Sequence, residues 1–135
     1  MVRYSYLWRR EHLHGQEEGS KDRPCAVLLS VVDEGGAQKV VVLPITHTPP
    51  NDPAEAVEIP TATKRRLGLD DQRSWIVLTE SNRFTWPGPD LRPIVPGNPT
   101  TVAYGELPRV LYERVRAGWL DLFKAKKARV VVRTE

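Results

Sequence analysis

Residues 26–45 read AVLLSVVDEGGAQKVVVLPI, and this stretch decides the fold. Two runs rich in β-branched and aliphatic residues, 26–32 and 39–45, flank Glu34-Gly35-Gly36, whose glycines suit a tight turn. The pattern predicts a β-hairpin. Because both runs are apolar at nearly every position, we expect the two strands to lie at the centre of the core with little exposed face.

Four shorter strands are expected outside the hairpin, one before it in the sequence and three after it. These segments share alternating or aliphatic side chains and are bounded by glycine, proline or polar residues. They are residues 4–8, 55–59, 75–79 and, as an edge strand among prolines, 91–95. Between the second and the third, Thr61 or Thr63 is expected to cap a short helical turn through Leu67, with Gly68 as its left-handed stop. The polar residues 9–22 predict a long loop.

A surface helix is expected at about 107–124. Pro108 suits its first turn, and its apolar residues fall on one broad stripe that can pack on the sheet. The basic tail 125–135 contains Val130-Val131-Val132, which predicts a final strand paired with an exposed sheet edge or with a second copy of the protein. The chain 1–135 is therefore expected to be a single, mainly β domain, with a small barrel at about 4–95.

Composition narrows the class of protein. A chain of 135 residues with 40% hydrophobic and 27% charged residues suits one globular domain. Its apolar runs are much shorter than the roughly 20 residues of a membrane span, and the N-terminus lacks a signal-peptide core, so a cytoplasmic protein is expected. The single cysteine forms no internal disulfide, and the three histidines lack metal-site spacing. Neither a metal nor another cofactor is expected.

The charge is mildly basic, with a formal net charge of +3. Basic residues gather at 9–10, at 64–66 and along 124–129. Such clusters point weakly to nucleic acid, and each one taken alone is more simply interpreted as a solvated face.

Two proline motifs border the hairpin. A polar loop ends in Arg23-Pro24 directly before the first central strand, and the second strand closes on Pro44-Ile45-Thr46. Residues 75–80, Trp-Ile-Val-Leu-Thr-Glu, form a third aliphatic run that ends at an acidic residue. This arrangement, over roughly residues 4–124, resembles the PemK/MazF family, the PemK-like growth inhibitors of toxin-antitoxin systems.

The resemblance implies a small SH3-like barrel of the CcdB/PemK type with a C-terminal surface helix. It also implies a homodimeric endoribonuclease, a hydrolase that cleaves single-stranded RNA without a metal and is neutralised by a cognate antitoxin. In such a reaction the 2′-hydroxyl of the RNA is the nucleophile, so the protein supplies a base, a donor for the leaving oxygen and positive charge for the phosphate.

Site residues follow from the same resemblance. Arg23 would hold phosphate oxygens through parallel hydrogen bonds, and Thr46 would orient the phosphate. Glu80 is the first candidate for the base, with His14 or His47 as the alternative. The candidate RNA-binding residues, which include both of these histidines, are Lys21, His14, His47, Asn82 and Trp86.

Structural interpretations of these residues stay open. Arg23 could form a salt bridge with Asp22 or Glu17, Glu80 could pair with Arg83 or Arg92, Asn82 could close a turn, and Trp86 could cover the core instead of stacking on a base.

Two other functions also stay open. The first loop carries Gly15-Gln16-Glu17 where many family members carry Gly-His-Glu, which leaves a non-catalytic barrel that binds RNA or a protein partner. The other is that of a gyrase-poisoning toxin of related fold.

Overall fold

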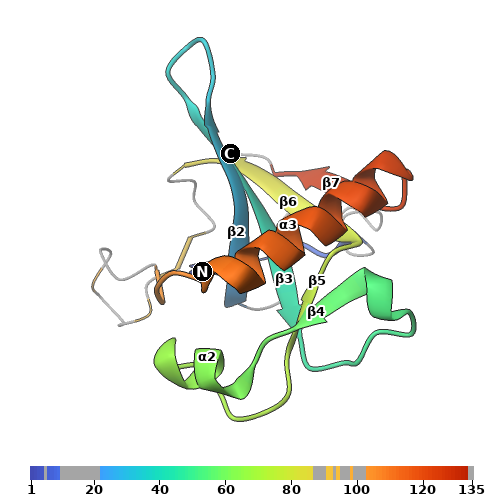
Figure 1. Ribbon diagram of the computed structural model, residues 1–135. Coiled ribbons are helices and arrows are strands. Elements are labelled where there is room, and N and C mark those ends of the chain that lie inside the picture. Colours follow the sequence, from blue (N-terminus) through green and yellow to red (C-terminus); the bar gives the residue numbers. More distant parts are fainter. Residues whose placement is uncertain are drawn as a thin grey trace.

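Seven strands form one sheet around the predicted hairpin (Figure 1). The computed structural model describes residues 1–4, 6–9, 22–86, 91–92, 94, 98 and 103–133. The strands are β1 (Val2–Tyr4), β2 (Arg23–Val32), β3 (Gln38–Thr46), β4 (Ala56–Glu58), β5 (Trp75–Val77), β6 (Glu80–Thr85) and β7 (Arg129–Val132). All neighbours pair antiparallel except β6 and β7, which are parallel. The mainly β fold class is confirmed, and over the described residues the sheet stays open.

The central strand β3 has a different neighbour on each edge. Along one edge it pairs with β2, with Cys25 opposite Pro44. Along the other it first pairs with β6, through residues 39–42, and then with β5, through Ile45 and Thr46. The hairpin predicted from the sequence is thus confirmed. At the end of β3 away from the hairpin turn, its neighbour on the second edge changes from β6 to β5.

Both faces of the sheet are covered, as the apolar character of β3 requires. Val40 and Val42 pack with Tyr4 and Phe84 in one cluster on one face. Leu43 and Ile45, at the alternate positions, pack in a second cluster that also holds residues of the C-terminal helix. The period of two along β3 therefore separates two cores, one on each face.

Helix α3 (Arg109–Lys124) lies across the sheet (Figure 1) and confirms the predicted surface helix. Its buried residues are Leu111, Val115, Trp119 and Leu122, and each burial of this kind stabilises the fold by about 1.5–3 kcal/mol. The predicted stripe was too wide, because Val110 is 75% exposed and Phe123 is 49% exposed. Among the described residues, no helix has the length and apolar character needed to cross a membrane.

The smaller elements follow the sequence pattern closely. Residues 53–55 form a 3-10 turn, η1 (Pro53–Glu55), directly before β4. Helix α2 (Thr61–Arg66) has Pro60 at its N-cap position and no side-chain cap, so the capping expected from Thr61 or Thr63 is wrong. Gly68, beyond its end, has a φ of +70°, the left-handed conformation expected of a glycine stop. The predicted C-terminal strand is β7, and it pairs with β6.

The first strand lies earlier than predicted: it spans Val2–Tyr4 and shares only Tyr4 with the expected 4–8. It ends at Tyr4, and the backbone of Leu7 bonds instead to the buried side chain of Asn82. The Asn82 Oδ1 accepts from the Leu7 N–H at 2.8 Å, and its Nδ2 donates to the Leu7 carbonyl at 2.8 Å. A side-chain amide therefore occupies the place of a neighbouring strand, which the alternation of residues 4–8 could not indicate.

One further expectation is wrong, and the sequence missed one strand. The outer half of the hairpin is not buried: Val31 is 59% exposed and Val32 is 65% exposed, because this end of the hairpin extends beyond the rest of the sheet (Figure 1). Strand β6 was not predicted, since its sequence ESNRFT is mostly polar although Ser81 and Asn82 are fully buried. Of the edge strand expected at 91–95, Leu91 forms a single bridge to Tyr4.

The Asn82 amide makes a sharp test of this fold. Asn82→Ala leaves the Leu7 N–H and carbonyl without partners in the core, and it removes the acceptor of the Arg133 guanidinium, 3.1 Å from Asn82 Oδ1. We predict a loss of about 3 kcal/mol in the free energy of unfolding, measured by urea denaturation. The exposed Asn51→Ala is the control and should change it by less than about 0.5 kcal/mol. Equal stability of the two variants would contradict the proposed role of the amide.

Candidate functional site

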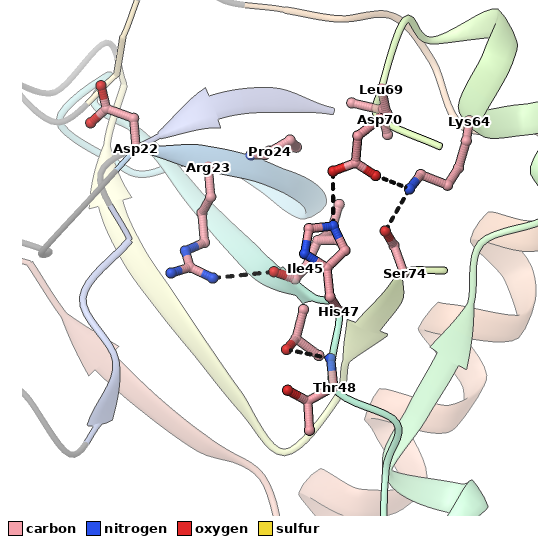
Figure 2. Close-up of a pocket in the computed structure, with 11 residues that line it drawn as sticks. Asp22, Arg23, Pro24, Ile45, His47, Thr48, Lys64, Leu69, Asp70 and Ser74 are labelled. Carbon is pink, nitrogen blue, oxygen red and sulfur yellow. Dashed lines mark hydrogen bonds and ion pairs between the residues drawn. The ribbon is translucent and has the colours of Figure 1, made fainter. Parts of the chain in front are cut away.

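A cavity of about 340 Å³ opens where β2 begins and β3 ends. Its walls come from these two strands, from α2 and from the segment between α2 and β5 (Figure 2). The lining residues are Asp22, Arg23, Pro24, Ile45, Thr46, His47, Thr48, Lys64, Leu69, Asp70 and Ser74. Three residues proposed from the sequence, Arg23, Thr46 and His47, therefore share one cavity.

Arg23 is the first residue of β2, and its side chain is fixed on two sides. Its Nη1 donates to the Ile45 carbonyl at 3.3 Å, and its guanidinium carbon lies 4.9 Å from the centre of the Trp8 ring. Its Nε is buried and has no hydrogen-bond partner in the described part of the chain. That buried Nε is closed to a ligand, so the guanidinium is held in place and can bind phosphate oxygens only through its terminal nitrogens.

Arg23 does not form the salt bridge with Asp22 that was its structural alternative. That carboxylate faces two other guanidinium groups, with its oxygens 3.7 Å from Arg3 and 3.5 Å from Arg92. Glu17, the other possible partner, lies outside the described residues. Arg92, which was also considered as a partner of Glu80, forms its ion pair with Asp22.

Thr46 ends β3 beside the cavity. Its backbone pairs with Trp75 of β5, which fixes the position of its side chain. The Oγ1 accepts from the Thr48 N–H at 3.1 Å, so the hydroxyl hydrogen can donate to a ligand. The hydroxyl is therefore oriented by the protein with its donor available.

His47 follows β3 and contacts Asp70 across the cavity wall. Its Nε2 lies 2.8 Å from Asp70 Oδ2, and both side chains are about half exposed. Asp70 also accepts from the Lys64 ammonium at 2.5 Å. The hydrogen bond from Lys64 is the main reason that the pKa of Asp70 lies below its usual value; partial burial opposes it, and His47 and the Gln72 N–H reinforce it. An ionised Asp70 can only accept, so His47 donates through Nε2, and Nδ1 is left to exchange protons.

Glu80, Asn82 and Trp86 lie in or next to β6 and do not line this cavity. Glu80 accepts from the Tyr6 hydroxyl at 3.2 Å and from the Arg9 N–H at 3.0 Å. Asn82 is fully buried and holds the Leu7 backbone. Trp86 is partly buried against the Phe84 ring, with 6.2 Å between ring centres, as expected of a residue that covers the core. Lys21 and His14 lie outside the described residues.

Lys64, Asp70 and Ser74 are the site residues that the sequence did not single out. Lys64 belongs to a basic run, 64–66, that was interpreted as a solvated face, yet its side chain is only 5% exposed. The sequence held one signal for this burial. Lys64 lies three residues before the apolar Leu67, which is also buried, so the two side chains lie on the same face of the helical turn. Among the described residues, no three His, Cys, Asp or Glu side chains cluster in a way that could hold a metal ion.

In comparisons with known proteins, no family model, no curated protein and no solved structure matches this chain. The resemblance to the PemK/MazF family therefore stays a prediction that depends on the motifs at residues 23–24, 44–46 and 75–80.

The lowered pKa of Asp70 predicts a pH dependence of stability. In the unfolded chain an aspartate titrates near pH 3.9, so the stabilisation from an ionised Asp70 is fully present above that pH and is lost as the pH falls through the lower folded value. Asp70→Asn should therefore reduce the free energy of unfolding at pH 7 by more than it does at pH 3, as measured by urea denaturation. The neighbouring exposed Asp71→Asn removes the same charge and should show no such convergence; a gap for Asp70→Asn that persists unchanged at pH 3 would refute the assignment.

Proposed function

We propose that this protein cleaves single-stranded RNA without a metal, as members of the PemK/MazF family do. The observation that carries the proposal is the cavity that brings the Arg23 guanidinium, the Thr46 hydroxyl and the His47 imidazole together. These are a phosphate-binding cation, an orienting hydroxyl and a group that accepts or donates a proton near neutral pH. A transfer of the phosphodiester to its own 2′-hydroxyl needs these kinds of group, together with a proton donor for the leaving oxygen, which water can be.

The reaction assigns a step to each residue. His47 Nδ1 takes the proton of the 2′-hydroxyl, and the 2′-oxygen then bonds to phosphorus as the bond to the 5′-oxygen breaks. The leaving 5′-oxygen takes a proton from solvent water, and the proton held by His47 passes back to solvent, which gives a 2′,3′-cyclic phosphate and a 5′-hydroxyl end. Arg23 binds the non-bridging oxygens, where negative charge develops. Thr46 donates to another.

The base in this proposal is His47 and not Glu80. Both were candidates from the sequence, but only His47 lines the cavity with Arg23 and Thr46. Its partner Asp70 holds the ring by Nε2, in the manner of a carboxylate that orients a general base.

The finer fold and the assembly are part of the same proposal. We propose that the open sheet belongs to a small SH3-like barrel of the CcdB/PemK type, and that a homodimer carries the activity and is neutralised by a cognate antitoxin. The support for these points is the family resemblance, together with the antiparallel hairpin and the helix packed on the sheet. Sedimentation at micromolar concentration would distinguish a dimer from a monomer.

A second function, RNA binding without cleavage on the same surface, is favoured by one observation. Arg23 already donates to a carbonyl and stacks on Trp8, which holds it as a fixed binding group even if no reaction follows. Product analysis separates the two functions.

Arg23→Ala should abolish most of the cleavage. The purified protein is incubated with a long single-stranded RNA in excess chelator, and the new ends are mapped. We expect discrete cuts with cyclic-phosphate ends, at a rate that falls about 100-fold or more in Arg23→Ala. Arg116→Ala, an exposed arginine on α3, removes the same charge away from the cavity and should cut at the wild-type rate. Intact RNA from the wild-type protein would leave binding as the function.

His47→Gln and Glu80→Gln identify the base. Loss of a general base typically costs 10²–10⁴-fold in rate, so we expect a loss of about 100-fold or more in His47→Gln and a much smaller loss in Glu80→Gln. Rates are measured on the same RNA after thermal unfolding has shown that both variants are folded. A larger loss in Glu80→Gln would return the role of base to that residue.

A further inference from the structure

Lys64 is the most buried charged group in the cavity wall. Its side chain is 5% exposed, and its ammonium donates to Asp70 Oδ1 at 2.5 Å, to Ser74 Oγ at 2.7 Å and to the Gln72 carbonyl. These three acceptors match the three donors of an ammonium group, so every donor is used. The lysine thereby ties α2 to the segment between α2 and β5 (Figure 2).

The contact with Ser74 does not make a nucleophilic serine. A serine–lysine pair of that kind needs a neutral amine that can take the hydroxyl proton. Lys64 has no such capacity, because it donates all three hydrogens and one acceptor is a carboxylate. Ser74 is itself only 1% exposed and donates to the Gln72 carbonyl at 3.2 Å. The lysine is therefore an anchoring cation and not a base.

Asp70 connects this anchor to His47. One of its oxygens, Oδ1, accepts from Lys64 and from the Gln72 N–H, and the other, Oδ2, faces His47 Nε2 at 2.8 Å. The carboxylate is about half exposed and would be mobile without its buried partner. Because Lys64 fixes one oxygen, the direction of the second oxygen is fixed, and with it the side of the imidazole that is bonded.

We propose that Lys64 is a positioning residue for His47: through Asp70 it holds the imidazole by Nε2, so that Nδ1 is the atom that exchanges protons with RNA. This inference rests on the proposed function for its catalytic meaning, but the arrangement Lys64–Asp70–His47 is a property of the folded protein that is measurable without any RNA. Lys64 itself touches no substrate in this scheme.

The test compares Lys64→Met with Arg65→Met. Both remove one positive charge from α2, but Arg65 is exposed, and no hydrogen bond or ion pair joins its side chain to Asp70 in the described part of the chain. Long-range nitrogen–proton NMR spectra report which ring nitrogen of His47 carries the proton. We expect Nε2–H in the wild type and in Arg65→Met, and the same displaced ring signals in Lys64→Met as in Asp70→Asn. Ring signals of Lys64→Met that stay at the wild-type position would overturn the proposal.

The second measurement is the rate of cleavage of single-stranded RNA. We expect kcat to fall by about 10-fold to 100-fold in Lys64→Met and Asp70→Asn, with KM nearly unchanged, because positioning of the base affects the chemical step and not RNA binding. A rise in KM alone would contradict the positioning role. If the wild type does not cleave RNA, the proposed function fails while the NMR comparison still decides the arrangement.

A measurement on the wild-type side chain covers the case in which Lys64→Met does not fold. A buried ammonium with three acceptors exchanges its protons slowly, so its Nζ signal should be observable by NMR at low temperature. The signal should move in Asp70→Asn and stay in place in the control Asp71→Asn. A signal that is indifferent to Asp70→Asn would also overturn the proposal.

Discussion

The structure depends on the backbone pairing of β3, which serves three other strands at once. Its pairing with β2 ends at Cys25 opposite Pro44, so Arg23 and Thr46, each two residues beyond this pair on its own strand, lie at the same end of the hairpin. On its other edge the neighbour changes from β6 to β5 near Pro44, a residue that has no N–H to donate to a ladder. The cavity lies at this change of partner, so the same irregularity ends one part of the sheet and forms the site.

The sequence predicted those parts that depend on local pattern. The hairpin, α3 and the final strand follow from runs of apolar residues, and the approach of Arg23 to Thr46 follows from an antiparallel hairpin alone. The sequence did not predict β6, Lys64 or Asp70. β6 and Lys64 place polar groups inside the protein, whereas Asp70 is about half exposed. Such burial is favourable only because partners distant in sequence satisfy these groups: Leu7 and Arg133 for Asn82, and Ser74 and Gln72 for Lys64.

The two buried polar centres therefore have different functions in the molecule. Asn82 joins the N-terminal segment to the C-terminal end of β7, since it contacts both Leu7 and Arg133, and it stabilises the fold. Lys64 joins α2 to the segment before β5 and orders the wall of the cavity. A sequence that contains a buried asparagine and a buried lysine gives no sign of which one serves the fold and which one serves the site; the cavity beside Lys64 distinguishes them.

The exposed end of the hairpin gives this chain a natural place for attachment. The turn at Asp33–Gly36 is held by its own bonds, with Asp33 Oδ1 accepting from Gly35 and Ala37, and the strands beside it have both faces in solvent. It stands at the opposite end of β2 from Arg23. A fluorophore, an affinity tag or an inserted loop at this turn would therefore leave both cores and the cavity untouched, because insertions are best tolerated at exposed loop tips.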